Sequence, residues 1–286
     1  MEQPVGGPEV RRAAIVEHLV ATGTGTARLD TLAQHFEVST MTIHRDLDVL
    51  AEEGKVERVR GGVRLVGQPF TERDVAVRRV ANAEVKTALA RVSVGLLEEG
   101  EVLALDDSTT VAALAPFLPG LAPGAVMTHS LSLLGELSRT LADTPLIGLG
   151  GRYVSTTDSF LGPATCEQMA GLSADVSLVS TTSLRAGGLY HPDEEAARTK
   201  TACVGLGQRA ILLCDSSKAG AAGVHFVARF EDFDEIVVDC HMAPDTLARM
   251  EESGARLHVV DAPEPACGAG RGPTCGVEAE SPGRER

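Results

Sequence analysis

At 286 residues the chain is long enough for two domains, since one domain takes about 100 to 200 residues. Its net charge of −14 argues against a protein that wraps nucleic acid over its whole surface, so any contact with nucleic acid should be local. The N-terminus lacks the apolar core of a signal sequence and no apolar run approaches the ~18 residues of a membrane span, which excludes a membrane partner and favours the cytoplasm.

The first clear pattern is a pair of short helices. Leu29, Leu32, Ala33 and Phe36 recur at i, i+3, i+4 and i+7, which predicts a helix with one buried face and with Asp30 as its N-cap. The pattern then breaks at residues 37–38, where we expect a tight turn.

Ser39 is placed to cap a second helix, in which Ile43, Leu47 and Leu50 repeat at i, i+4 and i+7. At 100° per residue the opposite face of this helix carries hydroxyl, imidazole and guanidinium groups near its N-terminus. Such groups suit base edges and phosphates in a major groove, where a helix-turn-helix docks its second helix. The predicted DNA contacts on this helix are Ser39, Thr40, Met41, Thr42, His44 and Arg45.

A basic hairpin is predicted next, after the helix ends at Gly54. Residues 55–64 alternate valines with charges, and Gly61-Gly62 can reverse the chain. Four positive residues face one Glu over residues 54–64, a net charge of +3 in an acidic protein. A helix pair or a charge run alone is often an ordinary core element or a solvated face, but their agreement here favours a DNA-reading unit over residues 8–65. The predicted contacts from the hairpin are Lys55, Arg58 and Arg60.

This unit resembles the winged helix-turn-helix of the DeoR family of bacterial transcription regulators. The resemblance implies a double-stranded DNA operator as partner. The family usually has two consecutive Arg in the reading helix, so His44-Arg45 implies a different operator sequence with the same binding mode. The residues that carry the resemblance are Arg11-Arg12, Leu32-Ala33, Val38-Ser39, Thr42-Ile43, Arg45-Asp46-Leu47, Leu50, Gly54 and Arg60-Gly61-Gly62.

A second domain is predicted over residues 81–261, after a linker and the start of a connecting helix over 66–80. Gly67 and Pro69 mark the linker, and a helix is expected over 72–97. Short β-prone runs then alternate with helices, which predicts an α/β domain with a Rossmann-like, mainly parallel sheet. The expected strands are Val102–Leu105, Ala125–Met127, Leu146–Leu149, Val176–Val179, Ile211–Leu213, Ile236–Val238 and Leu257–Val260, and the expected helices include Thr110–Phe117, Leu131–Leu141, Glu194–Leu206 and Pro244–Glu252.

Small, hydroxylated or charged residues follow nearly every one of these strands. The carboxyl ends of parallel strands line a ligand crevice, so we expect a phosphorylated or polyhydroxylated small molecule there. Asp106 and Asp215 could accept hydrogen bonds from sugar hydroxyls, and Lys218 or Lys200 could meet a phosphate. Each cluster alone could be a helix cap or a turn. The predicted effector site comprises Asp106, Ser108, Thr109, Thr110, Thr128, His129, Ser130, Gly150, Gly151, Lys200, Asp215 and Lys218.

The resemblance to the DeoR family extends over residues 10–261. The family's effector domain is similar to ribose-5-phosphate isomerase and to the glucosamine-6-phosphate deaminase type of fold, with a sugar-phosphate pocket where LDDSTT, THS, GLGG, GGL and DSSK stand here. Against the family pattern, Ser108 and Ser180 replace Gly, His129 replaces Asn and Ala196 replaces Glu. These departures imply either an unusual ligand or weaker binding.

Two functions follow as alternatives. The first is a repressor of a sugar or carbohydrate metabolism operon that a sugar phosphate relieves, acting as a symmetric oligomer because one head makes too few contacts for stringent selection. The second is a sugar-phosphate isomerase or deaminase with an appended head, with Asp106, Asp107 or Asp215 as base. The repressor is favoured because an isomerase needs no DNA-reading head.

No cofactor or metal site is expected. The six cysteines are scattered and none forms a C-x-x-C pair, so core thiols are the better interpretation. The segment 262–286 is rich in Gly, Pro, Ala and charge, which predicts a disordered tail, and its Cys267 and Cys275 are assigned no function.

Overall fold

The computed structural model describes residues 8–21, 26–53, 55–59, 62–65, 75–185, 187–219, 221, 223–263 and 265. Several sequence-based predictions lie outside these residues: the helix end at Gly54, Arg60 and Gly61 in the hairpin, residues 66–74 of the linker, and the tail from residue 266 onward.

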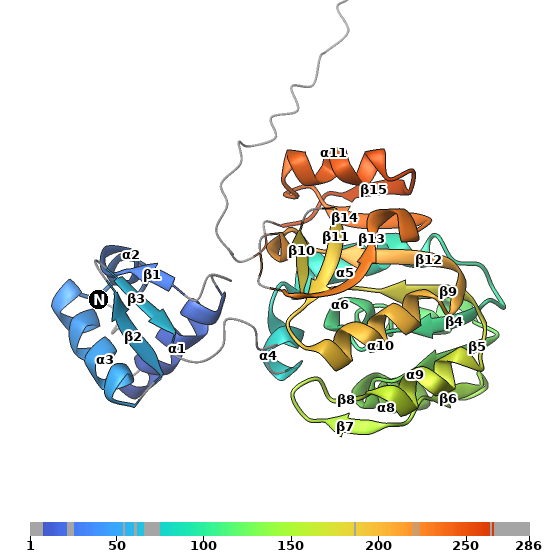
Figure 1. Cartoon of the computed structure of the whole chain (residues 1–286), viewed down its shortest axis with the longest axis horizontal. Coiled ribbons are helices and arrows are strands. Elements are labelled where there is room, and N and C mark those ends of the chain that lie inside the picture. Colours follow the sequence, from blue (N-terminus) through green and yellow to red (C-terminus); the bar gives the residue numbers. More distant parts are fainter. Residues whose placement is uncertain are drawn as a thin grey trace, which may run out of the picture.

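The N-terminal unit is a three-helix, three-strand winged helix-turn-helix, drawn in blue in Figure 1. Its strands form an antiparallel sheet in the order β1-β3-β2, and apolar side chains from all three helices and two of the strands share one core. A buried Asp46 accepts a hydrogen bond from Arg11 Nε at 2.6 Å, which holds α1 against α3. The elements are α1 (Pro8–Ala21), β1 (Thr26–Arg28), α2 (Leu29–His35), α3 (Thr40–Glu52), β2 (Val56–Val59) and β3 (Gly62–Leu65).

Two features of this unit differ from expectation. The N-cap position of α2 is Arg28, and Asp30, the predicted cap, lies inside the first turn because β1 leads directly into the helix. A carboxylate in the first turn still interacts favourably with the positive end of the helix dipole. The three-residue β1, which the sequence did not reveal, pairs with β3 and closes the wing.

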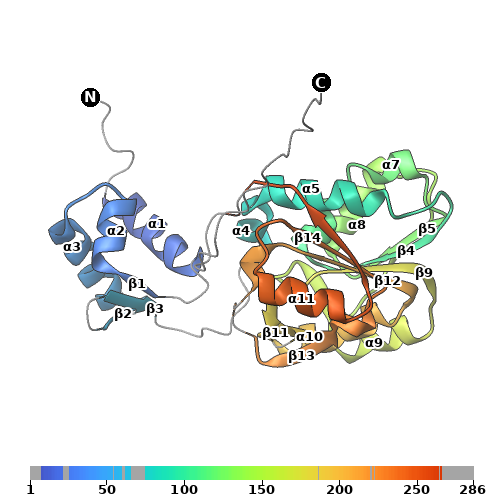
Figure 2. The same cartoon turned by 90° about the horizontal axis from the view of Figure 1, so that it is seen from above.

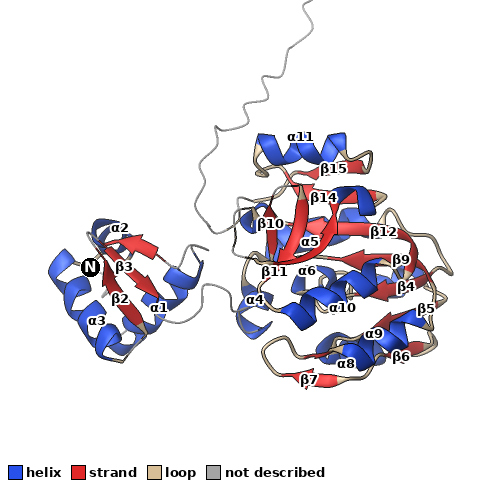
Figure 3. Cartoon of the chain, viewed as in Figure 1, coloured by secondary structure: helices blue, strands red, loops and turns tan. Residues whose placement is uncertain are grey.

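The larger domain is built on a seven-stranded sheet in the order β15-β14-β12-β9-β4-β5-β6, and all six pairings are parallel. Its strands are the seven that the sequence predicted. The mainly parallel, Rossmann-like sheet is therefore confirmed (Figure 3). The strands are β4 (Val102–Leu105), β5 (Ala125–Thr128), β6 (Leu146–Gly148), β9 (Ala174–Val179), β12 (Gly207–Cys214), β14 (Glu235–Asp239) and β15 (Arg256–Val260).

Successive side chains along each strand point to opposite faces of the sheet, so the domain has two hydrophobic cores, one on each face. In β4, for example, Leu103 and Leu105 face one core while Ala104 faces the other. The first core includes side chains of α5 (Ala83–Val94), α6 (Thr109–Ala112), α7 (Leu118–Leu121) and α8 (Leu131–Thr140). Figure 2 shows this layered arrangement from above.

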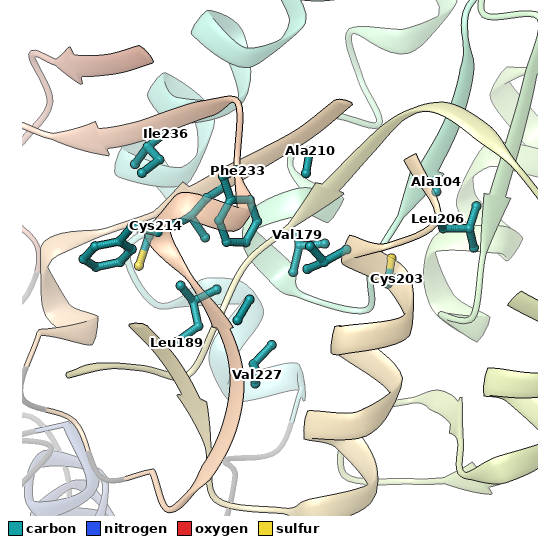
Figure 4. Close-up of a cluster of buried hydrophobic side chains, with 14 of the residues drawn as sticks. Ala104, Val179, Leu189, Cys203, Leu206, Ala210, Cys214, Val227, Phe233 and Ile236 are labelled. Atoms are coloured by element: carbon teal, nitrogen blue, oxygen red, sulfur yellow. The ribbon is translucent and has the colours of Figure 1, made fainter. Parts of the chain in front are cut away.

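The second core is covered by three helices and by a small sheet that the sequence did not predict. Figure 4 shows Val179 and Cys214 of the large sheet with Leu189, Val227 and Cys203 from the layer above it. These elements are α9 (Pro163–Ala170), α10 (Glu194–Val204), α11 (Pro244–Glu252) and the antiparallel strands β10 (Ser183–Arg185), β11 (Gly188–His191) and β13 (His225–Arg229). A separate hairpin is formed by β7 (Arg152–Val154) and β8 (Ser159–Leu161), and short 3-10 turns lie at Ser216–Lys218 and Phe230–Asp232.

Three predicted segments have different bounds in the structure. The helix expected over 72–97 is two helices, α4 (Val75–Val80) and α5, separated at Asn82, whose φ of 53° is left-handed. The helix expected over 110–117 is the single turn α6, followed by further turns. Ala262, expected in a disordered tail, is buried and accepts a hydrogen bond from His241 Nε2 at 3.0 Å, so the packed body continues past residue 261.

In the part of the chain that the structure describes, no helix is long and apolar enough to cross a membrane. The described cysteines are free thiols, and two of them, Cys203 and Cys214, are buried. Burial raises the pKa of both thiols above the ordinary value, so they pack as apolar side chains.

Candidate functional site

The helix α3 presents its N-terminal half as the predicted reading surface. Ser39 caps the helix, since its Oγ accepts a hydrogen bond from Thr42 N at 3.1 Å. Met41 is 62% exposed and Arg45 is exposed, whereas Ile43 is fully buried, so the outer face carries the side chains that the helical count placed there. The remaining predicted contacts on α3 are the exposed Thr40 and the half-buried Thr42 and His44.

One arginine of the wing makes polar contacts with this helix. Arg58 of β2 donates from its guanidinium to the ring Nδ1 of His44 and lies 3.5 Å from the Asp48 carboxylate. The Arg58 side chain is one-third exposed, so the same group can face a phosphate while it holds the wing on α3. Lys55 pairs with Glu53 at 2.7 Å on the exposed rim.

We expect Arg58→Ala to weaken operator binding almost uniformly across DNA sequences, because a phosphate contact carries no sequence information. The slope of log K against log salt should fall by roughly one unit when one phosphate contact is lost. Fluorescence anisotropy over a salt series measures this slope. Arg198→Ala, which removes an exposed arginine from α10, is the matched control, and an Arg58→Ala slope equal to the control's would contradict a phosphate role for the wing.

In the larger domain Asp106, directly after β4, joins three segments of the candidate effector site. Its Oδ1 accepts from Ser108 N at 2.9 Å and Ser108 Oγ at 2.5 Å, and its Oδ2 accepts from Ser180 N at 3.0 Å and Lys200 Nζ at 2.6 Å. A carboxylate accepts about four hydrogen bonds, so Asp106 is saturated. These internal hydrogen bonds show that Asp106 orders the loops around the site; that it also receives sugar hydroxyls stays a prediction.

Lys200 is likewise bonded to groups of the protein itself. Its buried Nζ bonds to Asp106 and to Asp107 Oδ1 at 2.8 Å. Burial by itself would raise the pKa of Asp107, but the ammonium of Lys200 and the nearby His129 hold that pKa well below its usual range. Of the two lysines considered for a phosphate, Lys218 fits, because it is partly exposed and lies 4.0 Å from Asp215 Oδ2.

Three buried side chains at the strand ends have polar atoms without a hydrogen-bond partner. They are both ring nitrogens of His129 after β5, Oγ of Ser180 after β9 and Oδ2 of Asp215 after β12. His129 Nε2 lies 3.5 Å from Asp107 Oδ1, within ion-pair range. An unsatisfied buried polar atom costs about 1–3 kcal/mol, so these groups favour a polar ligand at this edge of the sheet.

Other predicted site residues order the surrounding loops. Ser108 Oγ and Ser130 Oγ cap α6 and α8, and Thr128 Oγ1 accepts from Ser130 N. Gly150 O accepts from Thr165 Oγ1 at 2.9 Å, and a Cβ on Gly151 would lie 2.1 Å from the same Thr165 Oγ1, so only glycine lets the turn after β6 approach α9 so closely. Thr110 is buried on α6.

Sequence reasoning missed two polar residues beside the site. Asn82 donates from Nδ2 to Asp215 Oδ1 at 3.4 Å, and the buried Lys86 donates from Nζ to Thr109 Oγ1 at 3.0 Å. A signal for Lys86 was available, because it shares the face of α5 that Leu89 and Ala90 bury at i+3 and i+4. Burial raises the pKa of Asp215, but the positive charge of Lys218, with smaller contributions that include Lys86, more than offsets it and leaves this pKa lowered.

The chain matches two family models that together cover most of its length. The DeoR-like helix-turn-helix domain matches residues 11–68, and the DeoR C terminal sensor domain matches residues 81–240.

Curated relatives match along nearly their whole length. The HTH-type transcriptional regulator GlpR of Haloferax volcanii is 30% identical over 87% of this chain and 97% of its own. The transcriptional repressor AccR of Agrobacterium fabrum is 29% identical over 80% and 88%, and the L-fucose operon activator of Haemophilus influenzae is 29% identical over 79% and 90%.

Likenesses to solved structures are weaker. Ribose 5-phosphate isomerase A of Methanocaldococcus jannaschii has 15% identity and a TM-score of 0.36 over 49% of this chain and 55% of that chain. The translation initiation factor eIF-2B of Pyrococcus horikoshii has 11% identity and a TM-score of 0.39 over 82% of this chain and 90% of that chain.

Proposed function

Because the chain belongs to the DeoR family of transcriptional regulators, we propose that it represses an operon of sugar or carbohydrate metabolism and that a phosphorylated sugar relieves the repression. The relatives that match along its length are regulators and not enzymes, and Asp106, considered as a base, is saturated by hydrogen bonds. We assign residues 8–65 to DNA binding and residues 81–261 to the effector. Such a regulator would act in the cytoplasm, where bacterial DNA lies.

DNA recognition is proposed to rest on α3 and the wing. The exposed N-terminal half of α3 would enter the major groove, while the wing would contact the backbone. One such head reads few base pairs, so a symmetric oligomer on repeated half-sites is part of the proposal. The proposed contacts are Ser39, Thr40, Met41, Thr42, His44, Arg45, Lys55, Arg58 and Arg60.

The observation that carries the effector proposal is the set of unsatisfied atoms on His129, Ser180 and Asp215. A polyhydroxylated ligand offers donors to Asp215 and Ser180, and an acceptor or donor to the imidazole of His129. Lys218 at the same strand end supplies a positive charge for a phosphate. A sugar phosphate combines these groups in one small molecule.

A thermal-unfolding screen tests the effector class. Ribose 5-phosphate, fructose 6-phosphate and glucosamine 6-phosphate are added separately to the full-length protein, with the unphosphorylated sugars and inorganic phosphate as controls. An effector at 100 times its Kd adds about 2.7 kcal/mol of stability, which raises the unfolding temperature of a domain of this size by about 5 to 10 °C. If no sugar phosphate exceeds its controls, the proposed effector class is contradicted.

A further inference from the structure

The helix α4 is the first described element after the linker residues 66–74, so it is the point where the chain from the DNA-binding unit enters the larger domain. It spans only Val75–Val80, too short to be stable as an isolated helix. Its position must therefore depend on contacts with the rest of the domain, among them the groups that bind its two ends.

The C-terminal end of α4 is bound by a buried lysine and by a residue of the effector site. Lys86 Nζ donates to Ala81 O at 2.7 Å and to Arg78 O, which are carbonyls at the end of the helix. The same Nζ donates to Thr109 Oγ1 at 3.0 Å, and that hydroxyl in turn donates to Arg78 O at 3.3 Å. The end of α4 and the start of α6 thus share one hydrogen-bond network.

Asn82 links the same helix end to a second strand end of the site. With a left-handed φ of 53°, Asn82 directs its Nδ2 to Asp215 Oδ1 at 3.4 Å and to Ser217 Oγ at 3.3 Å. The other end of α4 is also fixed, because Val75 N donates to Thr156 O at 2.8 Å in the turn between β7 and β8.

We infer that Asn82 and Lys86 are positioning residues that connect α4 to the proposed effector site, so that effector binding changes how firmly the segment leading to the DNA-binding unit is held. This inference rests on the proposed function. The hydroxyl of Thr109 has a single hydrogen, which it gives either to Arg78 O or to a ligand oxygen. Asp215 Oδ1 accepts hydrogen bonds from Asn82 and Ser217, whereas Oδ2 of the same carboxylate has no hydrogen-bond partner. A ligand that donates to Oδ2 and shifts the carboxylate would therefore also displace Asn82.

Hydrogen exchange of the amides of residues 75–82 in the full-length protein tests whether Asn82 holds the end of α4 in place. Asn82→Asp keeps the size and the tolerance of a left-handed φ but sets a carboxylate against Asp215, and Asn82→Gly removes the side chain without backbone strain. We expect both variants to exchange these amides roughly three- to tenfold faster, the effect of losing about one net hydrogen bond. Thr87→Ala, on the exposed face of α5, should match the wild type. Wild-type exchange in both Asn82 variants would overturn the inference.

The coupling is tested with the sugar phosphate that raises the unfolding temperature in the screen above. It should speed exchange at residues 75–82 in the wild-type protein, because it displaces Asn82, and should leave exchange in Asn82→Gly largely unchanged, while still stabilising that variant. A sugar phosphate that stabilises the wild-type protein without changing exchange there would overturn the coupling and leave the proposed function standing. If no sugar phosphate stabilises the protein, the proposed function fails and the coupling fails with it.

Discussion

Replacing Lys200 by methionine is expected to lower the free energy of unfolding of the larger domain by about 3–5 kcal/mol, because it leaves buried carboxylates without their cation. Asp106 and Asp107 are both buried, and Lys200 Nζ bonds to them at 2.6 and 2.8 Å. Methionine fills a similar volume, so the loss would come from charge and hydrogen bonding more than from packing. Calorimetric or urea-induced unfolding of the domain measures the change.

The matched control for this variant lies two residues away on the same helix. Arg198→Met removes a cation whose ion pair with Glu194, at 2.7 Å, is largely exposed. Exposed pairs contribute about 0–1 kcal/mol, so this change should be small. Equal losses in the two variants would mean that the Lys200 cluster does not stabilise the domain.

Replacing Arg45 by alanine is expected to weaken binding to the specific operator by about 1–3 kcal/mol, roughly 5- to 150-fold in Kd. Arg45 is exposed on the outer face of α3, one residue after His44, and in the proposed complex its guanidinium would donate to two acceptors of a guanine edge. Alanine is the strongest helix former, so α3 should remain intact. Titration of labelled operator duplex against protein measures Kd.

Arg45→Lys separates base reading from charge. Lysine keeps the positive charge but lacks the planar fork, so its binding to unrelated DNA should match the wild type while its preference for the operator falls. Circular dichroism of each variant checks that the unit is folded. Operator affinity equal to wild type in Arg45→Ala would show that this side chain does not read a base.

The large sheet was predictable because its strands read as short apolar runs and its inner strands are buried on both faces. In β12, for instance, Ile211 and Leu213 face one core and Leu212 and Cys214 the other. The strands of the smaller sheet and of the hairpin, three to five residues long, carry no such signal, since burial there alternates over too few positions. The break at Asn82 was hidden because Ala and Val continue the same helical pattern on both sides of it.

The proposed effector site was placed from the polar residues that follow the strands, but the contacts that these residues make with one another could not be predicted. Asp106 and Lys200 are 94 positions apart, and nothing local in the sequence indicates that they pair. The same holds for Asn82 and Asp215, which are 133 positions apart. Roles inside a buried cluster depend on partner geometry, which only the folded chain supplies.

The contacts of Arg58 with α3 limit how the proposed operator preference could be redesigned. The guanidinium bonds to the His44 ring and pairs with Asp48, so an exchange at position 44 also removes one of the polar contacts between the wing and the helix. A reading helix transplanted from a relative would need a compatible side chain at position 58 to keep the wing in place. Because α3 and the wing contact each other in this way, variants with a changed base preference should be selected from libraries in which both segments are varied together.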